Sequence, residues 1–137
     1  MVLHEDDLVK YELKDGVVFG EFIKKNSIIS LELAQRFVET RIRVTNNKPH
    51  LFCLRTSNFK YAHKPVRDYM KKEGRKNIIA GAFVVNTPVA VVFFDLFIKM
   101  TRVDRLVPTR CFTTENEAID WLKKHELEKA ERLVTKR

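Results

Sequence analysis

The stretch IIAGAFVVNTPVAVVFFDLFIKM, residues Ile78–Met100, decides the fold class of this chain. It contains one apolar run, a polar break at Asn86-Thr87-Pro88, and a second apolar run. The first run, Ile78–Val85, is continuous rather than alternating, which predicts a strand covered on both faces. Thr87 is a typical N-cap and the proline after it suits the first helical position, so the second run predicts a helix over Pro88–Met100. A buried strand that leads directly into an apolar helix indicates an α/β protein.

Outside this stretch, strand and helix patterns alternate along the chain. Asp15-Gly16 between two short apolar runs is a strong hairpin signal, because both residues tolerate positive φ. After Ser30, a candidate N-cap, one face of a helix collects Ala34, Phe37, Val38, Arg41 and Ile42. The predicted strands are Val9–Leu13, Val17–Ile23, His50–Arg55, Ile78–Val85 and Thr109–Phe112. The predicted helices begin after Ser30, near Lys64-Pro65, at Pro88, and at the capping box Thr114-Glu115-Asn116-Glu117.

This order of elements predicts one domain over residues 1–137. We expect a mostly parallel five-stranded sheet, entered through an antiparallel hairpin, with about four helices in the order ββαβαβαβα. Its core would span about residues 9–124, and residues 125–137 would form a helical or frayed extension.

The charge of the chain is unevenly distributed. The formal net charge is +8, and residues 35–80 alone hold 12 basic and 3 acidic residues, a net charge of +9. Such a segment can attract nucleic acid, anionic lipid or an acidic protein. No recognition motif organises the basic residues, so nucleic-acid binding is the less favoured interpretation. The basic residues that could contact nucleic acid are Arg36, Arg41, Arg43, Lys71, Lys72, Arg75 and Lys76.

The sequence contains no motif for catalysis or cofactor binding. Its four histidines, His4, His50, His63 and His125, lack metal-ligand spacing, so we expect no metal site. The glycines are isolated, and no Gly-x-Ser-x-Gly sequence is present. We therefore expect no enzyme activity and no cofactor.

Two cysteines, Cys53 and Cys111, lie inside apolar runs, and the chain opens with acidic residues rather than a signal peptide. We expect both cysteines to be reduced, and the protein to be cytoplasmic. The longest apolar stretch is interrupted by Asn86, Pro88 and Asp95, which argues against a membrane span.

The helix predicted over Pro88–Met100 is apolar on nearly every side, so one face should remain uncovered by the sheet. Helical spacing predicts a sheet-facing stripe of Val89, Val92, Phe93, Leu96, Phe97 and Met100. That leaves Val91, Phe94 and Ile98 facing away. Exposed apolar patches usually mark association or ligand binding, and symmetric dimers are the commonest assemblies. We expect these three residues to form a homodimer contact or to cover a hydrophobic pocket.

Small ligands of open α/β sheets bind beyond the carboxyl ends of the strands. The polar residues predicted at those ends are Ser57, Asn58, Asn86 and Thr87. The most site-like cluster follows the third predicted strand and combines basic and aromatic residues: Lys60, Tyr61, His63 and Arg67. These eight residues are the candidate binding residues.

Several segments of the chain resemble those of the STAS/SpoIIAA-like fold. They are Ala34–Thr45 (AQRFVETRIRVT), Pro49–Arg55 (PHLFCLR), Val66–Met70 (VRDYM), Ala80–Pro88 (AGAFVVNTP), Cys111–Thr114 (CFTT) and Ala118–Leu122 (AIDWL). Together they make the chain similar to small bacterial STAS/SEC14-type proteins of unknown role, over about Tyr11–Lys124. The resembling segments are mainly packing motifs, and the resemblance implies a STAS-like single domain.

In anti-sigma-factor antagonists of this fold, a serine at the start of the helix after the central strand is phosphorylated. The corresponding stretch here is Tyr61-Ala62-His63-Lys64, which has no hydroxyl except the Tyr61 phenol, while Ser57 lies in the preceding loop. The resemblance implies a regulatory, non-enzymatic interaction module that acts through protein–protein association. The alternatives are a carrier of a small apolar or anionic ligand and a nucleic-acid-associated basic protein.

Overall fold

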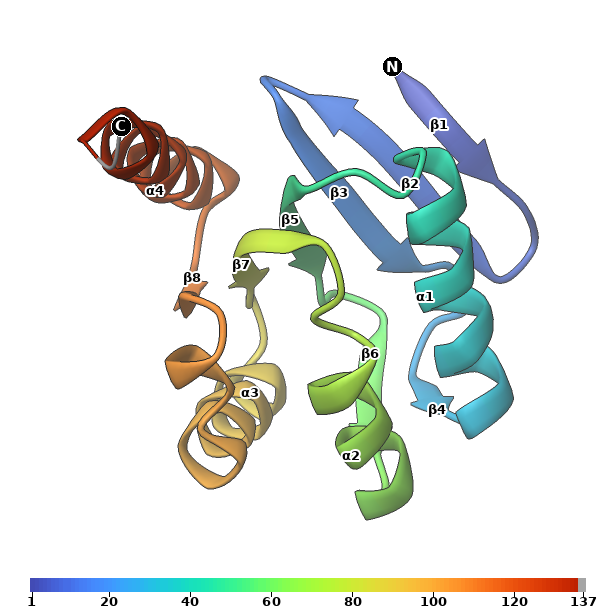
Figure 1. Ribbon diagram of the computed structural model, residues 1–137. Coiled ribbons are helices and arrows are strands. Elements are labelled where there is room, and N and C mark those ends of the chain that lie inside the picture. Colours follow the sequence, from blue (N-terminus) through green and yellow to red (C-terminus); the bar gives the residue numbers. More distant parts are fainter. Residues whose placement is uncertain (136–137) are drawn as a thin grey trace.

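The computed structural model describes the chain over residues 1–135, with side chains described through residue 129 (Figure 1). Six strands form one sheet in the order β1-β2-β3-β5-β7-β8, and β4 pairs with β6 in a small second sheet. The strands are β1 (Val2–Glu5), β2 (Val9–Lys14), β3 (Val17–Phe22), β4 (Ser27–Ile29), β5 (His50–Arg55), β6 (Phe59–Ala62), β7 (Ile78–Val84) and β8 (Thr109–Phe112). The helices are α1 (Leu31–Val44), α2 (Lys64–Lys72), α3 (Pro88–Thr101), the short 3-10 helix η1 (Val103–Arg105) and α4 (Glu115–Thr135).

The α/β class is confirmed, and so is the mostly parallel sheet that follows an antiparallel hairpin. Strands β2 and β3 pair antiparallel across Asp15-Gly16, while β3, β5, β7 and β8 pair in parallel. The predicted strand count is wrong, because β1 adds a sixth strand beside β2. Strands β4 and β6 were not predicted either. All three are only three or four residues long, too short for an alternating pattern to stand out.

The main sheet is covered on both faces, as the continuous apolar runs predict. Helices α1, α2 and α3 lie on one side, and α4 lies on the other (Figure 1). Strand β5, in the centre, is buried along five of its six residues. Under α4, the core is formed by Phe19, Leu51, Cys53, Ala82 and Leu122 with their neighbours. No helix of the described chain is long and apolar enough to cross a membrane.

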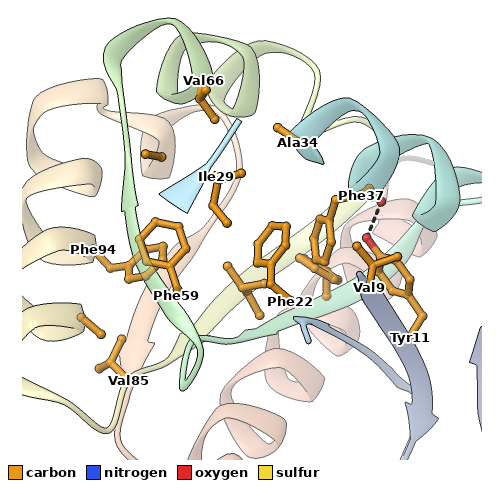
Figure 2. Close-up of a cluster of buried hydrophobic side chains, with 14 of the residues drawn as sticks. Val9, Tyr11, Phe22, Ile29, Ala34, Phe37, Phe59, Val66, Val85 and Phe94 are labelled. Atoms are coloured by element: carbon orange, nitrogen blue, oxygen red, sulfur yellow. Dashed lines mark hydrogen bonds between the residues drawn. The ribbon is translucent and has the colours of Figure 1, made fainter. Parts of the chain in front are cut away.

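The larger core, beneath α1, depends on the small size of Gly20 in β3. A Cβ atom on Gly20 would lie 2.8 Å from ring carbons of both Phe37 and Tyr11. The absence of a side chain lets these rings pack 4.9 Å apart, and the Tyr11 hydroxyl donates a hydrogen bond to the carbonyl of Phe37 (Figure 2). Phe22 stacks on the other side of Phe37 at 4.4 Å. These contacts fix α1 on the sheet.

The orientation predicted for α3 is wrong. Phe94 is fully buried, and Ala90 and Phe97 face the sheet beside it, while Val91 and Ile98 are half-buried. The predicted contact surface of Val91, Phe94 and Ile98 therefore lies at or inside the core. The exposed apolar residues are Val89, Val92, Leu96 and Met100, all of which were expected to face the sheet.

The error has a physical cause, because spacing cannot orient a helix that is apolar on opposite sides. The orientation is set by tertiary contacts between aromatic rings. The Phe94 ring lies 4.4 Å from Phe83 of β7. It also lies 4.8 Å from Phe59 of β6 (Figure 2). Strand β6 was not predicted, and the contact of Phe59 with this helix was therefore not predicted either.

Leu122 tests the assignment of α4 to the second face of the sheet. This side chain is fully buried, so Leu122→Ala should lower the free energy of unfolding by about 2–5 kcal/mol. Leu127 on the same helix is 66% exposed, and Leu127→Ala should change it by less than about 0.5 kcal/mol. Urea denaturation of both variants measures the difference. Equal effects from the two substitutions would contradict the packing of α4 described here.

Candidate functional site

The four candidate residues predicted at the carboxyl ends of the strands lie where expected, and two of them, Asn58 and Thr87, have structural partners. The ends of β5 and β7 are neighbours, with Arg55 opposite Val84. Asn58 donates hydrogen bonds from Nδ2 to the carbonyls of Phe22 and Ile23, at 3.1 and 3.2 Å. Thr87 caps α3 by accepting a hydrogen bond from the amide of Ala90. Only Ser57 and Asn86 are exposed there.

Three of the four residues of the predicted basic and aromatic cluster are in contact. The guanidinium of Arg67 donates a hydrogen bond to the Tyr61 hydroxyl at 3.3 Å, and its carbon atom lies 6.0 Å from the Tyr61 ring centre. The rings of Tyr61 and His63 are 5.0 Å apart. Phe93 of α3 joins them, with its ring 5.7 Å from Tyr61. We call Tyr61, His63, Arg67 and Phe93 the Tyr61 cluster; Lys60 is exposed beside it.

The solvent-facing side of α3 forms a continuous apolar surface next to the Tyr61 cluster. Its four members, Val89, Val92, Leu96 and Met100, are 64, 60, 49 and 77% exposed. Their spacing of three and four residues places them in one row along the helix. We call this row the α3 outer face. Asp95 and Lys99, both exposed, follow one edge of it.

The basic segment of the chain does not form one continuous charged surface. Arg36 pairs with the carboxylate of Asp6 at 2.8 Å, so part of the positive charge is neutralised by the acidic N-terminal residues. Arg41, which the sequence analysis counted with the surface charges, is only 1% exposed. The signal for its burial was present, because Arg41 shares a helical face with Phe37 and Val38.

The guanidinium of Arg41 is held by neutral acceptors. Nη1 donates to the carbonyl of Lys76 and contacts Nε2 of His50, both at 2.9 Å, and Nη2 donates to the carbonyl of Gly74 at 3.1 Å. The Arg41 carbon Cζ also lies 5.4 Å from the centre of the Phe52 ring. Among side chains described through residue 129, no carboxylate lies within 4 Å of this guanidinium.

His50 accepts the hydrogen bond of Arg41 in its neutral form. Burial lowers the pKa of His50 to about 4, and the nearby positive charge of Arg41 acts in the same direction. The hydrogen bond to the Lys48 carbonyl acts in the opposite direction but is the smaller effect compared with burial. Nε2 therefore acts as the acceptor and Nδ1 carries the proton that is donated to Lys48 O at 2.9 Å. Burial also raises the pKa of the Tyr11 hydroxyl well above its ordinary value. The groups around Arg41 thus remain uncharged at neutral pH.

Arg41 lines a cavity of about 80 Å³ between the sheet and its covering helices. The other walls come from α1, the end of α2 and the residues after it, the η1 region, and strands β3, β5, β7 and β8. They are mostly apolar and include Phe37, Leu54, Met70, Phe83 and Val107. Sequence reasoning missed this cavity, since it forms where elements distant in sequence meet.

The cysteines are unsuited to nucleophilic chemistry. Burial raises the pKa of the Cys53 and Cys111 thiols to about 12, so neither forms a thiolate at neutral pH. Both are free, and Cys53 is fully buried. In the described part of the chain, no three His, Cys, Asp or Glu side chains are grouped as metal ligands.

A family profile described as "Domain of unknown function (DUF7793)" matches residues 11–126. This match covers most of the chain, which therefore belongs to the DUF7793 family. No curated protein matches the sequence.

The buried neutral state of His50 predicts a pH-dependent stability. The unfolded chain protonates His50 with an ordinary pKa of about 6.5, whereas the folded protein leaves it neutral down to about pH 4. Between these values the unfolded state binds more protons, so the free energy of unfolding falls as the pH falls. The loss at pH 4 is on the order of 3 kcal/mol.

Urea unfolding between pH 7 and pH 4 measures this effect. Carboxylates also titrate near pH 4, so the informative quantity is the difference in free energy of unfolding between the wild type and His50→Gln. Between pH 6.5 and 4.5, the free energy of unfolding of the variant should fall much less steeply than that of the wild type. If both proteins show the same slope, His50 is protonated in the folded state and the assignment of Nε2 as acceptor is wrong.

Proposed function

We propose that this protein is a non-enzymatic interaction module that associates through the α3 outer face. The observation that carries the proposal is the exposure of four large apolar side chains in one row on one helix. Water contact with such a row is unfavourable, and association that covers it gains the corresponding hydrophobic free energy. The Tyr61 cluster extends the same surface with aromatic rings, which are enriched at interfaces.

A second copy of the chain is the partner that the charges favour. Asp95 and Lys99 carry opposite charges and follow the same edge of the α3 outer face. When two copies of α3 pack antiparallel around a two-fold axis near Leu96, Asp95 of each copy lies opposite Lys99 of the other. The apolar row then meets its own copy, as an isologous interface requires. The surface is thus self-complementary in both polarity and charge.

We further infer that the domain is of the STAS type, as its resemblance to STAS/SEC14-type proteins implies. The alternation of strands and helices after an N-terminal hairpin supports this assignment. In this interpretation, association does not depend on phosphorylation at the start of α2. The N-cap there is His63, which makes no side-chain capping hydrogen bond, and Pro65 follows in the first turn.

Light scattering after size-exclusion chromatography tests the association. The wild-type protein should give a mass that approaches twice the chain mass of 16.1 kDa as its concentration rises. Leu96→Glu places a charge at the centre of the α3 outer face and should give the monomer mass at every concentration. Leu127→Glu, at a similarly exposed apolar position outside that face, should leave the mass of the wild-type assembly unchanged.

Two outcomes contradict the proposal. One is a wild-type protein that stays monomeric over the whole concentration range. The other is a dimer that survives Leu96→Glu, which would place the contact elsewhere on the surface. Circular dichroism of each variant establishes that the fold is intact.

A further inference from the structure

We propose that the cavity lined by Arg41 is a binding site for a small amphipathic anion, a carboxylate with a short apolar chain. The carboxylate would meet the Arg41 guanidinium and the chain would lie against the apolar walls. This site is separate from the α3 outer face, and its occupation goes beyond the association proposed above.

The first argument is the unbalanced charge of Arg41. Its side chain is 1% exposed, and its hydrogen bonds go to two carbonyls and a neutral imidazole. Neutral acceptors satisfy donors but do not supply the opposite charge that a buried ion needs. Arg41 lines the cavity itself. A carboxylate in the cavity would therefore supply the missing counter-charge.

The second argument is the polarity of the cavity lining. Apart from the apolar residues, the lining includes Thr109 and two basic residues, Arg41 and Arg75. No acidic residue of the described part of the chain belongs to the lining. This composition favours an anion over a neutral or cationic ligand of the same shape.

The third argument is Gly81, in the middle of the central strand β7. A Cβ atom on Gly81 would meet only Cγ2 of Ile78 within 4 Å, at 3.7 Å. The space above Gly81 is therefore open, whereas the space above Gly20 is filled by aromatic rings. Glycine weakens a strand, and in a buried strand it often marks a place that a ligand approaches closely. Gly81 lines the same cavity as Arg41.

The cavity volume limits the length of the ligand. About 80 Å³ corresponds to roughly three groups the size of a water molecule, each about 30 Å³. The carboxylate itself takes up most of this space, so the chain beyond it should hold roughly one or two carbons. Each buried methylene should strengthen binding by about fourfold until the cavity is full.

The test titrates the protein with the sodium salts of the straight-chain carboxylates from acetate to octanoate, at constant ionic strength. Shifts of the backbone amide NMR signals of β7 and of Arg41 report binding. Affinity should rise from acetate to a maximum at propanoate and then fall from butanoate onward. The matching alcohols should bind at least tenfold more weakly, and the matching amines should not bind.

Two substitutions locate the site. Gly81→Val fills the open space from within the strand, so it should abolish carboxylate binding while raising the unfolding midpoint in urea. Arg41→Gln removes the positive charge, so it should weaken carboxylate binding at least tenfold and leave alcohol binding unchanged. Arg43→Gln is the matched control, because Arg43 is an exposed arginine on the same helix that is not part of the cavity lining, and it should change affinity by less than threefold.

The proposal is overturned if no carboxylate shifts these signals saturably, or if amines bind as well as carboxylates. It is also overturned if Gly81→Val binds carboxylates like the wild type, or if it destabilises the protein, because the space would then not be open. Should Arg41→Gln fail to fold, Gly81→Val and the comparison of carboxylate with alcohol decide the question without it.

Discussion

Strand β5 lies between β3 and β7 with five of its six residues buried, and the architecture follows from covering it on both faces. Side chains that point to one face must meet α1, α2 and α3, and those that point to the other must meet α4. The chain therefore returns across the sheet after β8 and places Leu122 against Leu51 and Cys53. On this side, charged residues of β2, β3 and β5 border the apolar core, and the guanidinium of Arg55 lies over the Phe19 ring.

Those charged residues are organised by Arg55 at the end of β5. Its guanidinium contacts carboxylates on β2, β3 and α4: Glu12 at 2.9 Å, Glu21 at 3.4 Å and Glu115 at 3.1 Å. Burial alone would lower the pKa of Arg55, but its hydrogen bonds with Glu115 and Glu12 raise it above the ordinary value. Arg55 and Arg41 therefore differ sharply. Arg55 has three carboxylate partners at the carboxyl end of the central strand, while Arg41 is buried with none among the described side chains.

Most of the fold could be predicted from local patterns. The bounds of β5 and β8 match those predicted, and Ser30 and Thr87 cap α1 and α3 as expected. These features depend on residues that are close in sequence. Each cap, for example, accepts a hydrogen bond from the backbone amide three residues after it. The pairing of β4 with β6 depends instead on backbone groups of strands that are distant in sequence. Strand β1 pairs with its neighbour β2, but four residues carry little pattern by which to predict it.

The candidate site was less predictable for the same reason. Tyr61, His63 and Arg67 are close in sequence, so their contact was foreseeable, whereas Phe93 reaches them from α3 only after the tertiary fold is formed. The orientation of α3 depends on Phe83 and Phe59, and the cavity is lined by residues as far apart in sequence as Arg41 of α1 and Gly81 of β7. Arg41 was counted as surface charge because composition was given more weight than its position on an apolar helical face.

The two outer strands of the main sheet determine which partners its backbone can recruit. Strands β1 and β8 have four residues each, and the pairing of β1 with β2 shifts register between Val2 and His4. Short, irregular or charged edges are the devices by which proteins prevent another strand from adding to a sheet. Glu5 on β1 and Arg110 on β8 place exposed charges on both. Extension of the main sheet by a foreign strand is therefore disfavoured at both of its edges.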